Sequence, residues 1–182
     1  MLTSLGLKFD LEVPRVTEAR LHGESIDEYP ERLARDKSQA GLAAWRARGQ
    51  GKEAVALAAD TIVVAGDELL EKPRDRADAT RMLRKLSGAD HRVITGVCVA
   101  AEGQQRSHAV VTLVRFADLS DGAVKWLVDS GDGDDKAGAY AIQGLAGAFV
   151  ERIDGSFSNV VGLPLVETLT LLAGAGLRMP WG

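Results

Sequence analysis

The sequence contains one cysteine, Cys98, among its 182 residues. A single thiol cannot form an internal disulfide, and it excludes a metal site built from several cysteines. Cys98 lies in the apolar run 97–100, where a buried and unreactive residue of a strand is expected. A chain of this length buries enough surface to fold without disulfides or a structural metal.

Aromatic residues and long apolar runs are also scarce. Aromatic side chains make up 5% of the chain, so stacking platforms for single-stranded nucleic acid are not expected. No uncharged apolar run approaches the roughly 18 residues of a membrane span. The first residues lack the cationic and apolar segments of a signal peptide. We therefore expect a cytoplasmic protein without a membrane partner.

Positive charge is in the minority. The chain has 22 Lys and Arg against 26 Asp and Glu, giving a formal net charge of −4. Neutralisation of many backbone phosphates needs the opposite balance, so no nucleic-acid partner is expected. A pocket for one nucleotide remains compatible with this charge, because a local site can be basic in an acidic protein.

Hydrophobic periodicity predicts alternating strands and helices in one domain. The predicted strands are 9–13, 55–65, 93–101, 109–116 and 148–153. Helices are predicted after a Ser25–Glu28 capping box, after Asp75, after Ser120 and from Pro164, and residues 46–52 are predicted to form a loop. Because residues 93–116 indicate a hairpin, we expect an α/β fold with a mixed, twisted sheet flanked by helices.

Asp60 stands out because it lies inside the most apolar run of the chain, residues 55–65. An ionised carboxylate there costs several kcal/mol unless it is paired, metal-bound or at an open strand end. A structural acid hydrogen-bonded to a helix end is an equally good interpretation of this residue alone.

Two further segments carry chemistry-bearing residues. Residues 71–74 place Lys72 and Arg74 on a proline-containing turn, and residues 135–144 combine Lys136 with small residues that let a ligand approach the backbone. An acid with several lysines suits an anionic substrate carrying a metal. A solvated loop and a tight glycine-rich connection are the alternatives. The histidines 22, 91 and 108 show no metal-ligand or triad spacing, and we expect them on the surface.

Six segments occur in the order found in a known family. They are residues 32–37, 59–61, 71–75, 82–88, 135–144 and 158–165. Together they resemble the Maf family of nucleoside triphosphate pyrophosphatases, and the string at 135–144 resembles the branch that acts on dTTP and UTP. The resemblance implies hydrolysis of a nucleoside triphosphate, including modified pyrimidine nucleotides, to the monophosphate and pyrophosphate. It also implies a Maf-like fold, related to inosine triphosphate pyrophosphatases, and a homodimer.

The resemblance also assigns roles to individual residues. Asp60 matches the catalytic acid-base residue, and Glu18 and Asp60 match candidate ligands of a divalent metal, Mg²⁺ or Mn²⁺. The phosphate-binding residues are Lys37, Lys72 and Lys136, which act as point charges. Thr61 and Gln143 match positions tied to base selection. A glutamine amide offers a donor and an acceptor, which suits the uracil and thymine edge.

One feature departs from the family pattern. The family begins with a strand and a Ser-x-Ser-Pro-Arg-Arg phosphate loop, and the printed sequence has no such segment. We therefore expect a single Maf-like domain over residues 1–182 that is N-terminally truncated relative to the family. Because bidentate arginine contacts stabilise phosphate strongly, the alternative function is a catalytically impaired nucleotide-binding or septum-formation-inhibiting protein.

Overall fold

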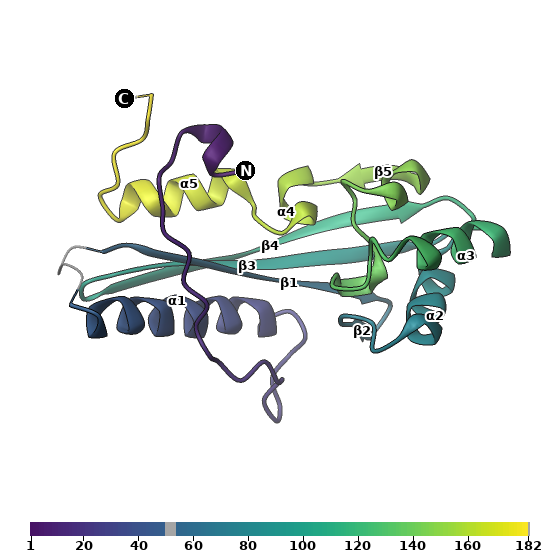
Figure 1. The fold of residues 1–182 in the computed structure, drawn as a ribbon, viewed down its shortest axis with the longest axis horizontal. Helices are drawn as coiled ribbons and strands as arrows, with labels where there is room; N and C mark the ends of the chain where they lie inside the picture. The colour runs from purple at the N-terminus through teal and green to yellow at the C-terminus, as the bar shows by residue number, and fades with distance from the viewer. Residues whose placement is uncertain (50–53, 182) are drawn as a thin grey trace. The chain divides into compact units, whose positions relative to one another are not determined.

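The computed structural model describes residues 1–49 and 54–181 (Figure 1). In these residues five strands form one sheet in the order β2-β1-β3-β4-β5. The strands are β1 (Ala56–Ala65), β2 (Glu68–Leu70), β3 (Asp90–Ala101), β4 (Gln104–Phe116) and β5 (Val150–Asp154). The α-helices are α1 (Tyr29–Ala47), α2 (Arg76–Leu86), α3 (Asp121–Ser130), α4 (Phe157–Val161) and α5 (Leu165–Gly174). The 3₁₀ turns are η1 (Thr3–Leu5), η2 (Ala137–Ala139) and η3 (Leu145–Phe149).

The predicted α/β class, with one open sheet flanked by helices, is confirmed. The sheet is antiparallel rather than mixed: Val63 pairs with Leu70, and Val114 pairs with Ile153, both in antiparallel ladders. Helix α2 connects β2 to β3, and these two strands flank β1 on either side. This crossover therefore places no parallel strands next to each other. The alternation of strands and helices along the sequence had suggested that some neighbouring strands would be parallel.

The chain divides into two compact units. Unit 1 contains residues 1–60, 96–108 and 165–182, and unit 2 contains residues 61–95 and 109–164. Strands β1, β3 and β4 each contribute residues to both units. The boundary in β1 falls directly between Asp60 and Thr61, so these adjacent residues belong to different units.

In unit 1, helix α1 packs closely onto β3. A β-carbon at Gly96 would lie 2.3 Å from the Pro30 carbonyl oxygen, so a side chain there is excluded. Ser38 donates a hydrogen bond to the sulfur of Cys98 at 3.1 Å. Cys98 is fully buried, as predicted, and burial raises the pKa of its thiol. Figure 1 shows α1 and α5 on opposite sides of these strand segments.

Unit 2 has its own hydrophobic core. Side chains from β1, α2, β4 and α3 pack there against Tyr140. His91 is buried beside this core and contacts the rings of Phe116 and Tyr140 edge to face. The prediction that His91 lies on the surface is therefore wrong, because the strand alternation of β3 points this side chain inward. Burial lowers the pKa of His91 to about 4.

Two predicted helix caps form as the sequence indicates. Asp75 accepts a hydrogen bond from the Asp78 backbone N–H, and Ser120 accepts one from the Ala123 N–H. Ser25 and Glu28 exchange the two bonds of a capping box at 3.2 and 3.4 Å. This box closes a turn just before the first residue of α1, Tyr29.

The predicted strand at 9–13 is wrong, since residues 7–20 form no strand or helix. Leu11 and Val13 are 87% and 90% exposed, whereas Glu12 forms an ion pair with Arg48, the residue that follows α1. The alternation is present, but the residue that lies against α1 is the charged Glu12, whose side chain is close to Gly41 of that helix. The short elements β2 and α4 were not predicted. The predicted loop 46–52 begins too early, because residues 46 and 47 still belong to α1, and its residues 50–52 lie outside the described residues. None of the described helices combines the length and apolar composition needed to cross a bilayer.

Candidate active site

In unit 1, three of the predicted site residues meet at one ammonium group. Lys37 Nζ lies 2.7 Å from Asp60 Oδ1 and 2.7 Å from Glu18 Oε1. The Lys37 and Asp60 side chains are 20% and 13% exposed, and Glu18 is 54% exposed. Asp60 is therefore paired, which is one of the ways an acid in an apolar strand can be accommodated. The same Lys37 ammonium also pairs with Glu18, whose carboxylate is more exposed.

Helix α1 positions this cluster through a second basic residue. Arg32 donates to the Ala19 carbonyl oxygen at 2.9 Å, and it forms ion pairs with Glu24 and Asp36 at 2.5 and 2.7 Å. The contacts with Ala19 and Glu24 hold the chain segment before α1 against the helix, and Asp36 orients the guanidinium from within the helix. Because Ala19 directly follows Glu18, the same guanidinium fixes the backbone that carries the Glu18 carboxylate.

The pKa of Lys37 reflects two opposing effects. Partial burial lowers this pKa, but the hydrogen bonds to Asp60 and Glu18 raise it more, so that it lies above its ordinary value of 10.5. Lys37 is therefore a cation at neutral pH. A cation hydrogen-bonded to a carboxylate stabilises the ionised form of that carboxylate.

In unit 2, the segment that carries Lys136 is tied to the turn that carries Lys72. The Gly138 N–H donates to the Glu71 carbonyl oxygen at 3.2 Å. Gly138 has φ +71°, and a β-carbon there would lie 3.0 Å from a Val63 methyl group, so glycine is required for this close approach.

Both lysines of these segments are exposed. Lys136 pairs with Asp135 at 2.6 Å. The Lys136 hydrogen bond, with a smaller contribution from the charge of Lys72, lowers the pKa of Asp135. The tight glycine-rich connection, given above as the alternative for residues 135–144, is therefore present, and the two joined segments each carry an exposed lysine.

Thr61 and Gln143 also lie in unit 2. Thr61 Oγ1 is 2.9 Å from Thr95 Oγ1 on β3. Gln143 is exposed, and the next turn of chain is held by Asp132, which accepts from the Leu145 N–H at 3.0 Å. A β-carbon at Gly144 would collide with that Asp132 carboxylate, at 1.7 Å, so glycine permits the bond that fixes the backbone after Gln143.

A cation has a suitable set of donors in unit 1. In the described residues no group of three or more His, Cys, Asp or Glu side chains forms a metal site. Mg²⁺ is typically bound by one or two carboxylates together with substrate phosphates. The Asp60 and Glu18 carboxylates, which approach the same nitrogen atom, fit that kind of site.

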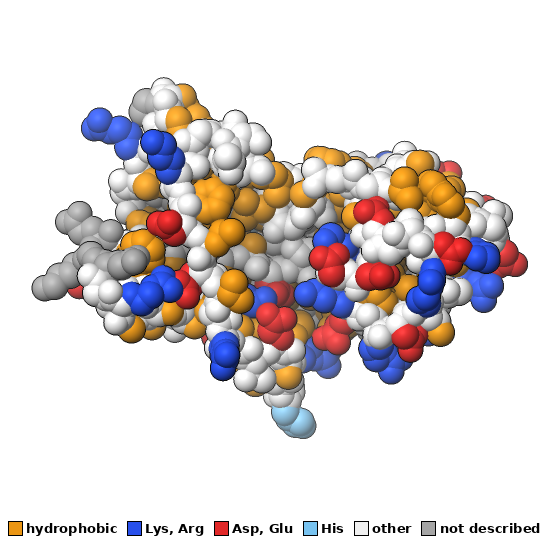
Figure 2. Space-filling view, in the orientation of Figure 1, with side chains coloured by type: hydrophobic (Ala, Val, Ile, Leu, Met, Phe, Trp, Pro, Cys, Tyr) orange, Lys and Arg blue, Asp and Glu red, His pale blue; other side chains and the backbone are white. Residues whose placement is uncertain are grey.

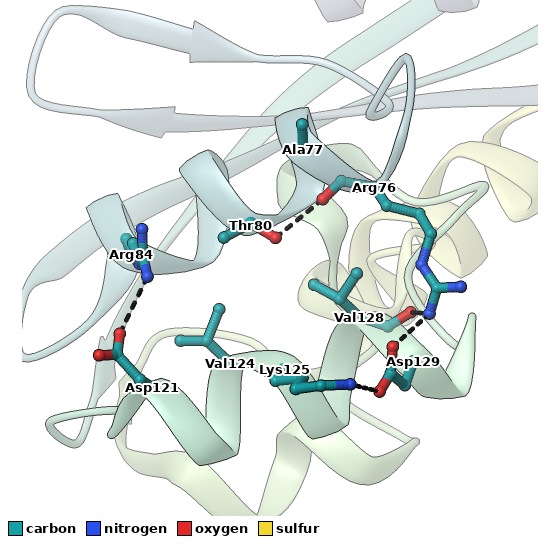
Figure 3. Close-up of a pocket in the computed structure, with 9 residues that line it drawn as sticks. All are labelled: Arg76, Ala77, Thr80, Arg84, Asp121, Val124, Lys125, Val128 and Asp129. Atoms are coloured by element: carbon teal, nitrogen blue, oxygen red, sulfur yellow. Dashed lines mark hydrogen bonds and ion pairs between the residues drawn. The ribbon is translucent and has the colours of Figure 1, made fainter.

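A cavity of unit 2 lies away from these residues. In unit 2, a cavity of about 370 Å³ lies between α2 and α3 (Figure 3). Its charged side chains neutralise one another: Arg84 pairs with Asp121 at 3.0 Å, and Asp129 pairs with Arg76 and Lys125. This cavity contains none of the predicted site residues. In Figure 2, acidic and basic side chains likewise lie next to each other across the visible face.

The sequence did not reveal two groups that shape the site. Arg32 lies inside the family-like segment 32–37, which could have drawn attention to it. Thr95, which contacts Thr61, carries no motif or spacing signal; only the strand pairing of β1 with β3 brings the two hydroxyls together.

Comparisons with known proteins identify relatives over nearly the whole chain. The profile described as "Maf-like protein" matches residues 1–175. A protein of Anaeromyxobacter dehalogenans named dTTP/UTP pyrophosphatase is 49% identical over 100% of this chain and 90% of its own length. Proteins of the same name from Vibrio cholerae and Salmonella typhimurium are 51% and 49% identical, over 94% and 95% of this chain and 89% and 85% of theirs.

Proposed function

Since the chain belongs to the Maf-like protein family, we propose that it is a pyrophosphatase that hydrolyses dTTP and UTP to the nucleoside monophosphate and pyrophosphate. The substrates are those named for relatives about 50% identical over nearly the whole chain. The observation in this molecule that supports the proposal is the Lys37 ammonium held between Asp60 and Glu18.

Hydrolysis of the bond between the α- and β-phosphates requires an activated water and neutralisation of phosphate charge. Asp60 is the group for the first task. Its carboxylate accepts the proton of the attacking water. Lys37, at 2.7 Å, keeps this carboxylate ionised, which is the form that can act as a base. The alternative role for Asp60 is to hold the metal.

A bound Mg²⁺ or Mn²⁺ would neutralise phosphate charge and lower the pKa of a bound water. Asp60 and Glu18 are the residues that would hold it. Binding of a divalent cation next to Lys37 would weaken at least one of the two ion pairs of that lysine, because like charges repel. Lys37 would then be available to bind phosphate oxygen.

The remaining roles belong to unit 2. We assign Lys72 and Lys136 to phosphate binding because both ammonium groups are exposed on segments fixed to each other by the Gly138–Glu71 hydrogen bond. Thr61 and Gln143 are assigned to selection of the base. We further propose a homodimer, which sedimentation at micromolar concentration tests directly.

The test of this function is pyrophosphate release from dTTP, UTP, CTP and GTP with Mg²⁺ or Mn²⁺. We expect turnover that depends on the metal and favours dTTP and UTP. Binding of these nucleotides without pyrophosphate release would contradict the enzyme assignment and favour the nucleotide-binding alternative. Equal kcat/KM for all four nucleotides would contradict the substrate assignment alone.

A further inference from the structure

A chain of hydrogen bonds in unit 2 runs from β1 through β3 to α4. Thr61 Oγ1 lies 2.9 Å from Thr95 Oγ1, and Thr95 Oγ1 lies 3.0 Å from the backbone carbonyl oxygen of Asn159. Thr95 is fully buried, so solvent supplies no alternative partner for its hydroxyl. The three groups form a linear relay with Thr61 at its outer end.

The direction of this relay is determined by chemistry. A carbonyl oxygen only accepts hydrogen bonds, so Thr95 donates its single hydroxyl proton to Asn159. Thr95 then has only acceptor capacity for Thr61, and Thr61 donates its own proton to Thr95. The Thr61 oxygen is left able to accept a hydrogen bond and unable to donate one to any further partner.

The inner end of the relay is rigidly held. The Asn159 side chain is fully buried and donates to the Val93 carbonyl oxygen at 3.1 Å and to Thr112 Oγ1 at 2.9 Å. The Asn159 carbonyl oxygen also accepts from the Gly162 N–H at 2.9 Å. This carbonyl therefore keeps a donor even when the Thr95 hydroxyl is removed.

The outer end of the relay remains accessible because of a glycine. Gly162 has φ +111°, and a β-carbon at this position would lie 3.4 Å from Thr61 Oγ1. The bare backbone of Gly162 leaves space beside the Thr61 hydroxyl that any other residue would partly fill. Thr61 itself is only partly buried.

We propose that Thr95 is a specificity-determining positioning residue that keeps the Thr61 oxygen a hydrogen-bond acceptor toward the base. This inference rests on the proposed function, in which Thr61 contacts the base. Uracil and thymine carry an N3–H that such an acceptor matches, whereas cytosine presents an unprotonated N3 that repels it. The relay thus selects bases by the direction of a proton rather than by size.

The experiment compares kcat/KM for UTP and CTP in the unmodified chain and in Thr95→Val. The valine keeps the shape of the side chain and frees the Thr61 proton, which can then be donated to cytosine N3. We expect the UTP:CTP ratio to fall roughly five- to tenfold, the size of one hydrogen bond, mainly through improved use of CTP. Thr95→Ser retains the hydroxyl and should retain the ratio.

Thr112→Val is the matched control. Thr112 is also fully buried and bonded to Asn159, but none of its hydrogen bonds involves Thr61. We expect it to lower the melting temperature and leave the ratio unchanged. In a Thr61→Val background, Thr95→Val should change the ratio no further, because the relay has lost its outer end.

The outcomes distinguish a failure of the proposed function from a failure of the inference about Thr95. Failure of the unmodified chain to release pyrophosphate from UTP overturns the proposed function, and the inference with it. Selective hydrolysis of UTP with an unchanged ratio in folded Thr95→Val overturns the inference and leaves the function intact. An equal shift in Thr112→Val also overturns the inference, because general loosening of the Asn159 network would then explain the effect.

Discussion

Each unit of the molecule contains a mostly buried aspartate paired with cations, and the two arrangements differ in kind. In unit 1, one ammonium, that of Lys37, is shared by the carboxylates of Asp60 and Glu18. In unit 2, one carboxylate, that of Asp78, is shared by the guanidinium groups of Arg74 and Arg81 at 3.0 and 2.9 Å. The backbone N–H of Arg74 adds a third donor to Asp78.

The difference indicates which aspartate is placed for chemistry. Asp78 has both oxygens engaged by donors from its own helix and the residues just before it, and it fixes the turn that carries Lys72. The partner of Asp60 comes from a distant helix and is divided between two carboxylates. A metal that competes for the carboxylates, or a phosphate group that competes for Lys37, can rearrange the contacts of Asp60. Asp78 is held by two guanidinium groups and a backbone N–H, so the loss of one contact leaves the others in place.

The largest expected effect comes from Asp60→Asn. The amide keeps the size of the side chain and removes the base, so pyrophosphate release should fall by about 10²–10⁴-fold, the usual contribution of acid-base catalysis. Turnover of dTTP and UTP in saturating metal measures it, with circular dichroism to show that the fold is retained. More than about a tenth of the original rate would exclude Asp60 from acid-base chemistry.

Removing the shared cation should have the next largest effect. Lys37→Met keeps most of the aliphatic side chain, removes the ammonium and leaves two carboxylates facing each other. We expect kcat/KM to fall by roughly 100-fold, the loss associated with one donor to a transition-state charge. Lys37→Arg is the matched variant: a planar guanidinium replaces the point charge, and only partial recovery is expected. Full activity of Lys37→Met would show that the pairing with Asp60 is purely structural.

Glu18→Gln should act mainly on the metal. Glu18 is the more exposed of the two carboxylates, and its loss leaves Asp60 as the remaining predicted ligand. The Mg²⁺ concentration for half-maximal activity should rise about tenfold, equivalent to roughly 1.4 kcal/mol of binding, with little change in kcat at saturating metal. Glu12→Gln, which removes an acid of the same segment that pairs with Arg48, is the control. An unchanged metal requirement in Glu18→Gln would exclude this residue as a ligand.

The sequence allowed most of the fold to be predicted where its signals are local. The caps at Asp75 and Ser120 and the apolar run of β1 depend on neighbouring residues, and all appear as expected. The segment 9–13 failed because alternation alone does not show which side of a strand-like segment is buried. The burial of His91 was missed for a related reason, since its partner Tyr140 is 49 residues away.

The site was predictable only as far as its residues could be recognised by their segments. The meeting of Lys37 with Asp60 joins residues 23 positions apart, and it follows from the packing of α1 on the sheet. Nothing in the sequence indicated Thr95, whose role depends on a strand pairing and on a backbone carbonyl. Asp78 was missed as well, because nothing in the sequence of this first helical turn indicates that two arginine side chains converge on its carboxylate.

The smallest effect on activity is expected from Asp78→Asn, which acts on acid stability instead. The hydrogen bonds from the Arg74 side chain and backbone, and then from Arg81, lower the pKa of Asp78 from 3.8 to about 2. An acid with a lowered pKa in the folded state contributes stability that is fully present above its unfolded-state pKa and is lost as the pH falls through the folded-state value. The denaturation midpoint of Asp78→Asn should therefore lie below that of the unmodified chain at pH 6, and the gap should narrow between about pH 4 and pH 2.

Urea titrations at pH 6, 4, 3 and 2 measure this gap, and pyrophosphate release at pH 7 should stay within about twofold of the unmodified chain. A gap that does not depend on pH would show that the Asp78 ion pairs contribute no stability of their own. A loss of turnover comparable to that of Asp60→Asn would remove the distinction between the two aspartates.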